Sequence, residues 1–284
     1  MAAPGCRSRT AGPGSARAGP AVAGSQQSSK LMAPIDNWGD KVLSRFDQSA
    51  QNYNASATLQ HAVAGQLANH CRQQVVPRGL WVDLGSGTGH LAEALEARHP
   101  GQRVLRVDGS EAMLRQQPLS SKTQQWDLRG PLPRWPEAPS LLASSFCLHW
   151  LPTPGEVIRH WLHQLAPGGW LAVALPVEGC FPQWHRAAET TGIPCTALAF
   201  PEMEALLRWV RADQIRMRED MHCNAVAPTL PKLLKPLRKV GADCSTQPSL
   251  PVRDWRALQQ AWPDHDGAGQ LRLTWVIQLL LIQR

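Results

Sequence analysis

The most informative part of this chain is Val82-Asp83-Leu84-Gly85-Ser86-Gly87-Thr88-Gly89, from which we predict the centre of its fold. It reads as a short buried strand that runs into a glycine-rich turn, and residues 90–98 then place apolar side chains on one helical face. Glycines allow positive φ angles and a close approach of the backbone, and the free N–H groups at a helix start favour a carboxylate or phosphate. We therefore predict a ligand-binding turn between a strand and a helix.

The spacing around this turn narrows the choice of ligand. A P-loop is excluded because no Gly-Lys-Ser or Gly-Lys-Thr follows, and the dinucleotide pattern fits poorly because the third glycine comes one residue early. Asp108 lies 23 residues after Gly85, at the end of the next expected strand, where an acid can bind both hydroxyls of an adenosine ribose. Turn and acid together favour S-adenosylmethionine, with a nicotinamide cofactor or a purely structural turn as alternatives.

The same arrangement predicts the other residues of a cofactor site. Asp127 follows Asp108 by 19 residues and can accept a hydrogen bond from an adenine amino group while Leu128 covers the ring; a loop acid or helix cap is the alternative for Asp127. Residues 145–150 would border a transferred methyl group, with Trp150 as a pocket or a core side chain. The predicted cofactor-binding residues are Asp83, Gly85, Ser86, Gly87, Gly89, Asp108, Asp127 and Leu128.

Strands and helices alternate along most of the chain, which predicts its fold class. Two amphipathic helices are expected within residues 40–71 and another at residues 154–165. Strands are expected at residues 80–84, 104–107, 141–146, 170–175 and 271–282. The alternation favours an α/β, Rossmann-like class I methyltransferase fold: a mostly parallel seven-stranded sheet, helices on both faces and right-handed crossovers. Residues 177–240 look mainly helical and are expected to form an inserted lid.

Composition sets limits on domains and function. The chain has 284 residues, 43% of them hydrophobic, and a formal net charge of +7. Residues 1–31 are rich in Ala, Gly, Ser, Pro and Arg, so we expect a disordered extension before a domain at residues 32–284, with Met32 as an alternative start. No apolar run is long enough to span a bilayer, and the seven cysteines are scattered without a CxxC pair. We expect a cytoplasmic protein without a metal site.

Basic residues gather between positions 208 and 239, where only three acids accompany them. They are Arg208, Arg211, Arg216, Arg218, Lys232, Lys235, Arg238 and Lys239. A solvated helix face is one interpretation and a docking surface for an acidic partner is the other.

A set of short motifs outside the glycine turn resembles one family. The motifs are Arg45-Phe46-Asp47-Gln48-Ser49-Ala50-Gln51-Asn52-Tyr53, Leu165-Ala166-Pro167-Gly168-Gly169, Leu237-Arg238-Lys239-Val240-Gly241-Ala242 and Ala261-Trp262-Pro263. They resemble the malonyl-acyl-carrier-protein O-methyltransferases of biotin synthesis, over residues 40–284. The chain departs from that pattern at Ser144-Ser145, where Ser-Asn is usual, and at His149-Trp150, where Gln-Trp is common.

The resemblance implies methylation of the free carboxylate of a malonyl group carried as a thioester on acyl carrier protein or coenzyme A. That carboxylate is ionised at pH 7, so positioning and exclusion of water would replace a general base. The implied pocket residues are Tyr53, closing over the methionine part, then Trp150, Trp184 and Arg186; a surface arginine is the alternative for Arg186. The implied partner is an acidic acyl carrier protein docked by Arg208, Arg211, Lys232, Lys235, Arg238 and Lys239.

Two other function classes remain open. A carboxyl methyltransferase for a small free acid of the aconitate type would have the same cofactor site and a different lid. A methyltransferase-like protein that binds without catalysis is the second alternative. A nucleic-acid methyltransferase is disfavoured because no Asn/Asp-Pro-Pro-aromatic signature follows the expected fourth strand.

Overall fold

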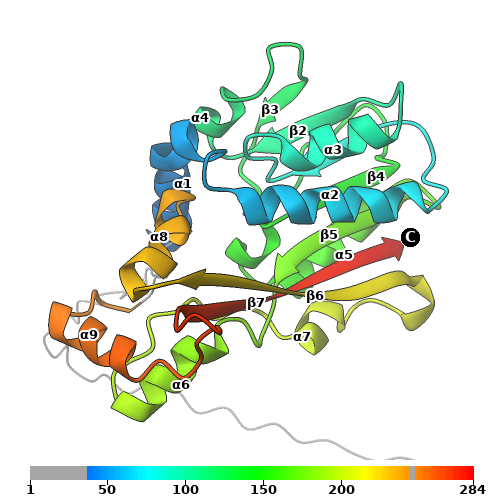
Figure 1. Cartoon of the computed structure of the whole chain (residues 1–284). Helices are drawn as coiled ribbons and strands as arrows, with labels where there is room; N and C mark the ends of the chain where they lie inside the picture. Colours follow the sequence, from blue (N-terminus) through cyan, green and yellow to red (C-terminus); the bar gives the residue numbers. More distant parts are fainter. Residues whose placement is uncertain (1–36, 243–246) are drawn as a thin grey trace, which may run out of the picture. The chain divides into compact units, whose positions relative to one another are not determined.

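The computed structural model describes residues 37–242 and 247–284, so the predicted extension at residues 1–31 and Met32 lie outside the described residues. Within these residues, one seven-stranded sheet has the strand order β3-β2-β1-β4-β5-β7-β6 (Figure 1). Its strands are β1 (Trp81–Leu84), β2 (Val104–Asp108), β3 (Thr123–Gln125), β4 (Leu141–Ser145), β5 (Trp170–Pro176), β6 (Ile215–Ala227) and β7 (Leu271–Gln283). The predicted number of strands is confirmed.

The first five strands run parallel to one another. β1 lies between β2 and β4, β3 extends the sheet beyond β2, and β5 pairs with β4. Parallel strands covered on both faces are apolar along their length, and β1 and β5 are accordingly buried at every position. β3 has only three residues at the sheet edge, two of them exposed, so no apolar run in the sequence marks it.

The last two strands run antiparallel, and they correct the expected helical lid. β7 pairs antiparallel with both β5 and β6, and β6 occupies 13 of the residues assigned to the lid. Along β6 half-buried and exposed residues alternate, and the exposed positions include Arg216, Arg218 and Asp220. This charged, period-two pattern is typical of an antiparallel edge strand with one face in water, and it contains no apolar run.

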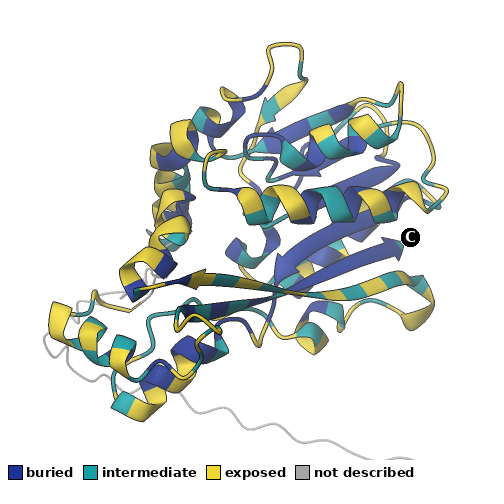
Figure 2. Cartoon of the chain, viewed as in Figure 1, coloured by how far each residue is buried: buried dark blue, intermediate teal, exposed yellow. Residues whose placement is uncertain are grey.

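Helices cover both faces of the sheet, as predicted. Figure 2 shows the strands buried in the middle and the helices exposed on their outer sides. One apolar core joins the sheet to α2, α3, α6, α8 and α9, and a second core joins the opposite face to α5 and α7. The helices are α1 (Asn37–Ser49), α2 (Thr58–Arg72), α3 (His90–Arg98), α4 (Glu111–Leu114), α5 (Pro154–Gln164), α6 (Pro182–Thr191), α7 (Met203–Leu207), α8 (Leu230–Lys239) and α9 (Val252–Gln260). None of the described helices is both long and apolar enough to cross a membrane.

Three short 3-10 turns complete the described structure: η1 (Ala50–Asn52), η2 (Leu148–Trp150) and η3 (Ala212–Gln214). η1 joins the two predicted N-terminal helices, α1 and α2. Since parallel strands end at the same edge of a sheet, the loops after β1, β2 and β4 meet there. This edge holds the glycine turn, Asp108 and the segment 145–150.

Candidate functional site

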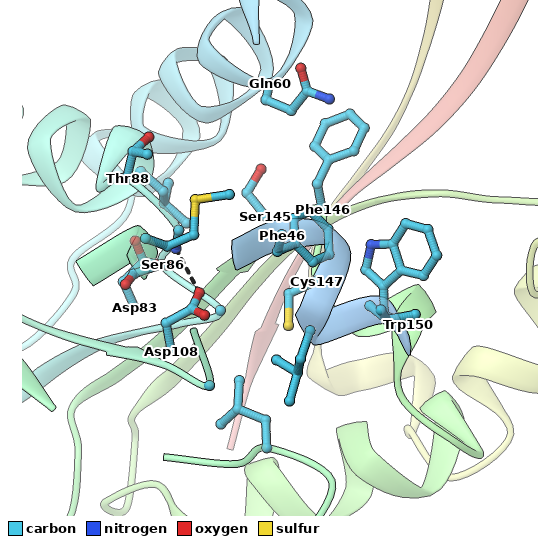
Figure 3. A pocket seen from close by; sticks show the side chains of 18 of the residues that line it. Phe46, Gln60, Asp83, Ser86, Thr88, Asp108, Ser145, Phe146, Cys147 and Trp150 are labelled. Carbon is cyan, nitrogen blue, oxygen red and sulfur yellow. Dashed lines mark hydrogen bonds between the residues drawn. The ribbon is translucent and has the colours of Figure 1, made fainter. Parts of the chain in front are cut away.

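A cavity of about 110 Å³ lies at the carboxyl ends of β1, β2 and β4 (Figure 3). The sequence places these residues far apart, and the parallel sheet brings them to one edge. The cavity lining includes the predicted residues Asp83, Gly85, Ser86, Gly87, Asp108, Asp127, Leu128, Tyr53 and Trp150. Gly89 is not in the lining: it precedes α3 with a φ of 98°, and its N–H donates to the carbonyl of Ser86 at 2.8 Å. Its role is therefore to start the helix.

The glycine turn forms a cradle that larger residues could not make. Gly85 has a φ of 73°, and a Cβ at this position would overlap the side chain of Cys147. Gly87 has a φ of 53°, and nothing lies within 4 Å of where its Cβ would be, so this side of the turn is open. Backbone without side chains therefore faces the cavity, which is the surface that a nucleoside-bearing cofactor needs for close approach.

Asp108 is fixed by two backbone hydrogen bonds. The N–H of Gly87 donates to Oδ2 at 2.8 Å (Figure 3). The N–H of Ser110 donates to Oδ1, also at 2.8 Å. Burial raises the pKa of Asp108, and these hydrogen bonds oppose the rise. Each carboxylate oxygen keeps a further lone pair. Asp108 can thus accept hydrogen bonds from two ribose hydroxyls while it holds the turn in place.

Asp83 has a structural position beneath the turn. Its side chain is 1% exposed, and Oδ2 accepts a hydrogen bond from the N–H of Ala92 at 3.1 Å. Burial raises the pKa of Asp83 to about 7, while the hydrogen bond from Ala92 and the charge of Arg106 oppose the shift. Asp83 therefore ties the end of β1 to the first turn of α3 from the bottom of the cavity.

Asp127 lies in the cavity wall but already has a strong partner. The guanidinium of Arg129 donates to both of its carboxylate oxygens, at 2.7 to 3.0 Å, and this interaction lowers the pKa of Asp127. Arg129 also donates to Asp40 of α1 at 2.8 Å. Leu128 is 6% exposed and lines the same cavity. The predicted adenine contact of Asp127 stays a prediction, and the structure adds that Arg129 fixes its orientation.

The prediction missed one residue that supports the turn. Gln117 is 6% exposed, and its Nε2 donates to Oγ of Ser86 at 3.1 Å and to the carbonyl of Gly87 at 2.7 Å. It follows α4 in the sequence Gln116-Gln117-Pro118, and neither glutamine carries a local signal that distinguishes it from the other. Only the tertiary contact identifies Gln117.

A second cavity, of about 310 Å³, adjoins the first. Both cavities are lined by Phe46, Tyr53, Gln60, Phe146 and Trp150. The second is otherwise strongly aromatic, with His149, Phe181, Trp184, Phe200, Trp255 and Trp275 in its wall. The implied pocket residues Tyr53, Trp150 and Trp184 are thus brought together around connected space.

Arg186, the fourth implied pocket residue, is not part of this space. It lies on α6 two positions after Trp184, is exposed, and is absent from the lining of both cavities. Successive residues of a helix point about 100° apart, so Trp184 and Arg186 cannot share the buried face. The surface position, which was the alternative, is the one that the structure shows.

The second cavity is neutral inside and positive at its rim. The cationic residues in its lining are Lys41, Arg45 and Arg238, and all three are exposed. Burial lowers the pKa of His149 to about 3, so this imidazole is neutral at pH 7. Burial and the negative charge of Asp108 both raise the pKa of Tyr53, which keeps its hydroxyl protonated. An anionic acceptor can therefore be attracted to the rim and held inside by neutral groups.

The predicted basic cluster is divided between two ends of a strand. Arg208 and Arg211 precede β6, whereas Lys232, Lys235, Arg238 and Lys239 lie on α8, which follows it. Thirteen strand residues span roughly 40 Å, so the two groups do not form one surface. The remaining two basic residues lie on β6 itself: Arg216 donates a hydrogen bond to Gln283, and Arg218 donates one to Gln278.

Comparisons with known proteins agree with this geometry at the level of a domain. Residues 82–171 match the model of a methyltransferase domain. The trans-aconitate 2-methyltransferase of Mycobacterium tuberculosis is 34% identical over 100 residues, covering 34% of this chain and 36% of that protein. The enzyme of the same name from Paracidovorax citrulli is 39% identical over 98 residues, covering 34% and 38%. The match thus spans little more than a third of these relatives' length.

Two solved structures resemble most of the described chain. A protein from Bacillus halodurans assigned as a methyltransferase has a TM-score of 0.53 at 12% identity, covering 76% of this chain and 97% of that one. The YcgJ protein from Bacillus subtilis has a TM-score of 0.51 at 13% identity, covering 77% and 98%. These similarities confirm the predicted Rossmann-like methyltransferase fold.

The domain match also confirms S-adenosylmethionine as the cofactor, since residues 82–171 contain the glycine turn, Asp108 and Asp127. The acceptor is a separate matter. The curated relatives bear the name of the predicted alternative, an aconitate enzyme, and not that of the malonyl family whose motifs the sequence resembles.

Proposed function

We propose that this protein is a methyltransferase that transfers the methyl group of S-adenosylmethionine to a carboxylate oxygen of an acidic acceptor. The main support for this proposal is that the two cavities are connected: both are lined by Phe46, Tyr53, Gln60, Phe146 and Trp150. A cofactor cavity that opens into an aromatic, water-excluding cavity provides a place for the second reactant. The shared residues surround the point where the two reactants would meet.

The residues of the first cavity fit the cofactor. Asp108 would accept hydrogen bonds from the ribose hydroxyls, and Leu128 would cover the adenine ring. The open side of the turn at Gly87 would admit the part of the cofactor that approaches the backbone. Bound there, S-adenosylmethionine supplies an electrophilic methyl group on a positively charged sulfur. Tyr53 reaches both cavities and would close over the methionine part.

The acceptor needs no general base. A carboxylic acid with an ordinary pKa near 4 is already ionised at pH 7 and is itself the nucleophile. The chain's contribution is to exclude water and to hold the carboxylate oxygen in line with the methyl group. The side chains that line the cavities agree with a reaction without a general base. The low pKa of His149 makes it a weak base, and the raised pKa of Tyr53 keeps its hydroxyl protonated.

Two acceptors are candidates, and the first comes from the relatives. A small polycarboxylate such as trans-aconitate is what their name specifies. The matched 100 residues cannot cover the whole acceptor cavity, however, because its lining runs from Lys41 to Trp275. The similarity therefore supports carboxyl methylation more strongly than it supports this particular acid.

The second candidate is a malonyl thioester, which the motifs resemble, and the charge distribution favours it. A tricarboxylate brings two further carboxylates into the cavity, and buried charges require partners. The lining cations Lys41, Arg45 and Arg238 are all exposed at the rim. A malonyl thioester has one free carboxylate and a long neutral arm, which suit an aromatic interior. Its other end carries the phosphates of coenzyme A or an acidic carrier protein, which suit a basic rim.

Methyl transfer from radiolabelled S-adenosylmethionine tests the proposal. Malonyl-acyl carrier protein, malonyl-coenzyme A and trans-aconitate are compared, with acetyl-coenzyme A as the matched thioester that lacks a free carboxylate. Transfer to an acid but not to acetyl-coenzyme A is expected, and Asp108→Ala should abolish it. Cofactor binding without transfer to any of the acids would overturn the proposal in favour of a non-catalytic binding protein. Preference for malonyl thioester over trans-aconitate, or the reverse, decides between the candidates.

A further inference from the structure

The segment 145–150 separates the two cavities. Ser145 lines the first cavity, His149 lines the second, and Phe146 and Trp150 line both. Phe146 has a φ of 54°, in the left-handed region that non-glycine residues avoid at a cost of roughly 1–2 kcal/mol. Backbone strain of this kind persists where the surroundings enforce it, often beside a functional site. The strained residue lies at the junction of the two cavities.

Two neighbouring side chains of this segment, His149 and Trp150, make no hydrogen bond to any described residue. His149 Nδ1 is buried and has no hydrogen-bond partner within the described residues. Trp150 makes ring contacts but donates no hydrogen bond to any described residue, and its indole nitrogen lies on the side of the ring toward the other labelled cavity residues (Figure 3). Since no described residue fixes the His149 tautomer, the ring proton can reside on Nε2. Both rings can therefore donate to a bound group.

Packing fixes these rings even though hydrogen bonds do not. The centroids of His149 and Trp150 are 4.8 Å apart, and His149 lies 5.7 Å from Phe200. Trp150 also packs edge-on against Phe46 at 5.8 Å and is tilted against Trp38 at 6.2 Å. Aromatic contacts on several sides hold both rings in place, so their N–H groups are positioned before any acceptor arrives.

We infer that the ring N–H groups of His149 and Trp150 bind the reacting carboxylate of the acceptor, so that this carboxylate is recognised by neutral donors and not by a cation. The inference rests on the proposed function. Both rings line the second cavity and donate to no described residue, so their N–H groups are available to a ligand, and a carboxylate is the acceptor that the proposed reaction brings to this junction. The cations of the second cavity are exposed at its rim, and His149 and Trp150 belong to the segment between the two cavities. Trp184, whose buried indole nitrogen also has no partner among the described residues, lines the second cavity only.

Neutral recognition has a chemical advantage at this position. A guanidinium would bind both carboxylate oxygens and stabilise the negative charge that has to react. Two N–H donors can hold the carboxylate and leave lone pairs of its oxygens available toward the first cavity. Because the imidazole stays neutral, it offers a single donor and adds no positive charge beside the cofactor's sulfur.

The test compares His149→Phe with His160→Phe in the methyl-transfer assay with malonyl-coenzyme A and with trans-aconitate. His160 is a matched control because its Nε2 is also buried without a partner among the described residues, yet it lies on α5 and lines neither cavity. We expect His149→Phe to lower kcat/KM for the acid by about 10- to 100-fold, the usual effect of losing a hydrogen bond to a charged group. His160→Phe should stay within about 2-fold of wild type, in keeping with an ordinary position outside the site.

A third variant separates recognition from packing. His149→Gln keeps an N–H near the reach of Nε2 and cannot be protonated, so it should retain most of the activity that His149→Phe loses. Calorimetry should give an unchanged dissociation constant for S-adenosylmethionine in all three variants. The inference is wrong if wild type methylates an acid and His149→Phe behaves as His160→Phe does, or if His149→Gln is as inactive as His149→Phe. A wild-type protein that methylates no acid is a different result, which overturns the proposed function itself.

Discussion

The backbone N–H of Gly87 donates a 2.8 Å hydrogen bond to Oδ2 of Asp108, which joins the glycine turn after β1 to the end of β2. The two residues are 21 positions apart in the chain. One carboxylate thus shapes the turn and remains able to bind the ribose. Changes at Asp108 should consequently affect the cofactor site twice, through the turn and through the ligand.

Asp108→Asn should weaken binding of S-adenosylmethionine by about 10- to 100-fold, as expected for loss of hydrogen bonds to a charged acceptor. Oδ1 and Oδ2 now accept from the N–H groups of Ser110 and Gly87, so an amide nitrogen at either position would face a donor. Calorimetric titration measures the effect. Asp220→Asn, at an exposed position of β6, is the control and should bind normally. Equal affinities for the two variants would contradict the assigned role.

Gln117→Leu should raise the dissociation constant for the cofactor by about 5- to 10-fold, because two hydrogen bonds to the turn are lost. The neighbouring Gln116 is exposed and donates only to the carbonyl of Ala112 in α4, so Gln116→Leu is a closely matched control. The same calorimetric titration compares them. Normal binding by Gln117→Leu would mean that the turn is stable without this support.

Gly85→Ala should destabilise the protein more than Gly168→Ala. Both glycines have φ near 74°, so each substitution carries a backbone cost of roughly 1–2 kcal/mol. Only at Gly85 would the new methyl group also overlap Cys147, which adds about 1–3 kcal/mol of overpacking; at Gly168 nothing lies within 4 Å. Urea unfolding gives both free energies of unfolding. Equal losses would show that Cys147 moves aside without cost.

The raised pKa of Asp83 makes stability depend on pH in a defined window. An aspartate that titrates near 3.8 when unfolded and about 7 when folded binds its proton more tightly in the folded state. Its contribution to stability is complete below about pH 4 and falls by about 1.4 kcal/mol per pH unit up to about pH 7. Asp83→Asn does not ionise, so it should gain stability relative to wild type as pH rises through that window.

Urea unfolding of wild type and Asp83→Asn without cofactor, at pH 5, 6, 7 and 8, provides the measurement. The difference between the two should grow from pH 5 to pH 7 and then level off. Asp213→Asn, at an exposed residue paired with Arg211, controls for general charge effects. Parallel profiles for wild type and Asp83→Asn would contradict the raised pKa.

The division of the basic residues leads to a prediction about a carrier-protein partner. Arg238 lines the second cavity, and Lys239 follows it on α8, whereas Arg208 and Arg211 lie at the opposite end of β6. If the acceptor is carried on an acidic acyl carrier protein, Arg238→Glu with Lys239→Glu should raise its KM by about 10-fold and flatten its salt dependence. Arg208→Glu with Arg211→Glu should change neither. Identical behaviour of the two pairs would exclude α8 as the docking surface.

Local sequence signals were sufficient for most of the fold. Buried parallel strands produce apolar runs, and amphipathic helices produce a 3.6-residue period, so the residues alone were enough to locate β1, β5 and α3. The strand β6 was missed and assigned to a helical lid, because its exposed positions carry charges and its pattern is set by the long-range partner β7. β3 was hidden for a similar reason, with three residues that obtain their conformation from β2.

The cofactor end of this protein could be predicted from the sequence alone. The turn requires glycines, and an acid has to follow after the next strand at a suitable spacing, so both requirements are visible in a short stretch of residues. The rest of the site depends on how distant segments pack together. In the folded chain His149, Trp184 and Trp275 line one cavity, Arg186 is exposed at the surface, and Gln117 donates a hydrogen bond to the turn. These positions depend on which helix face is buried and which strands pair. Such contacts join distant segments, so the residues next to each position in the sequence do not reveal them.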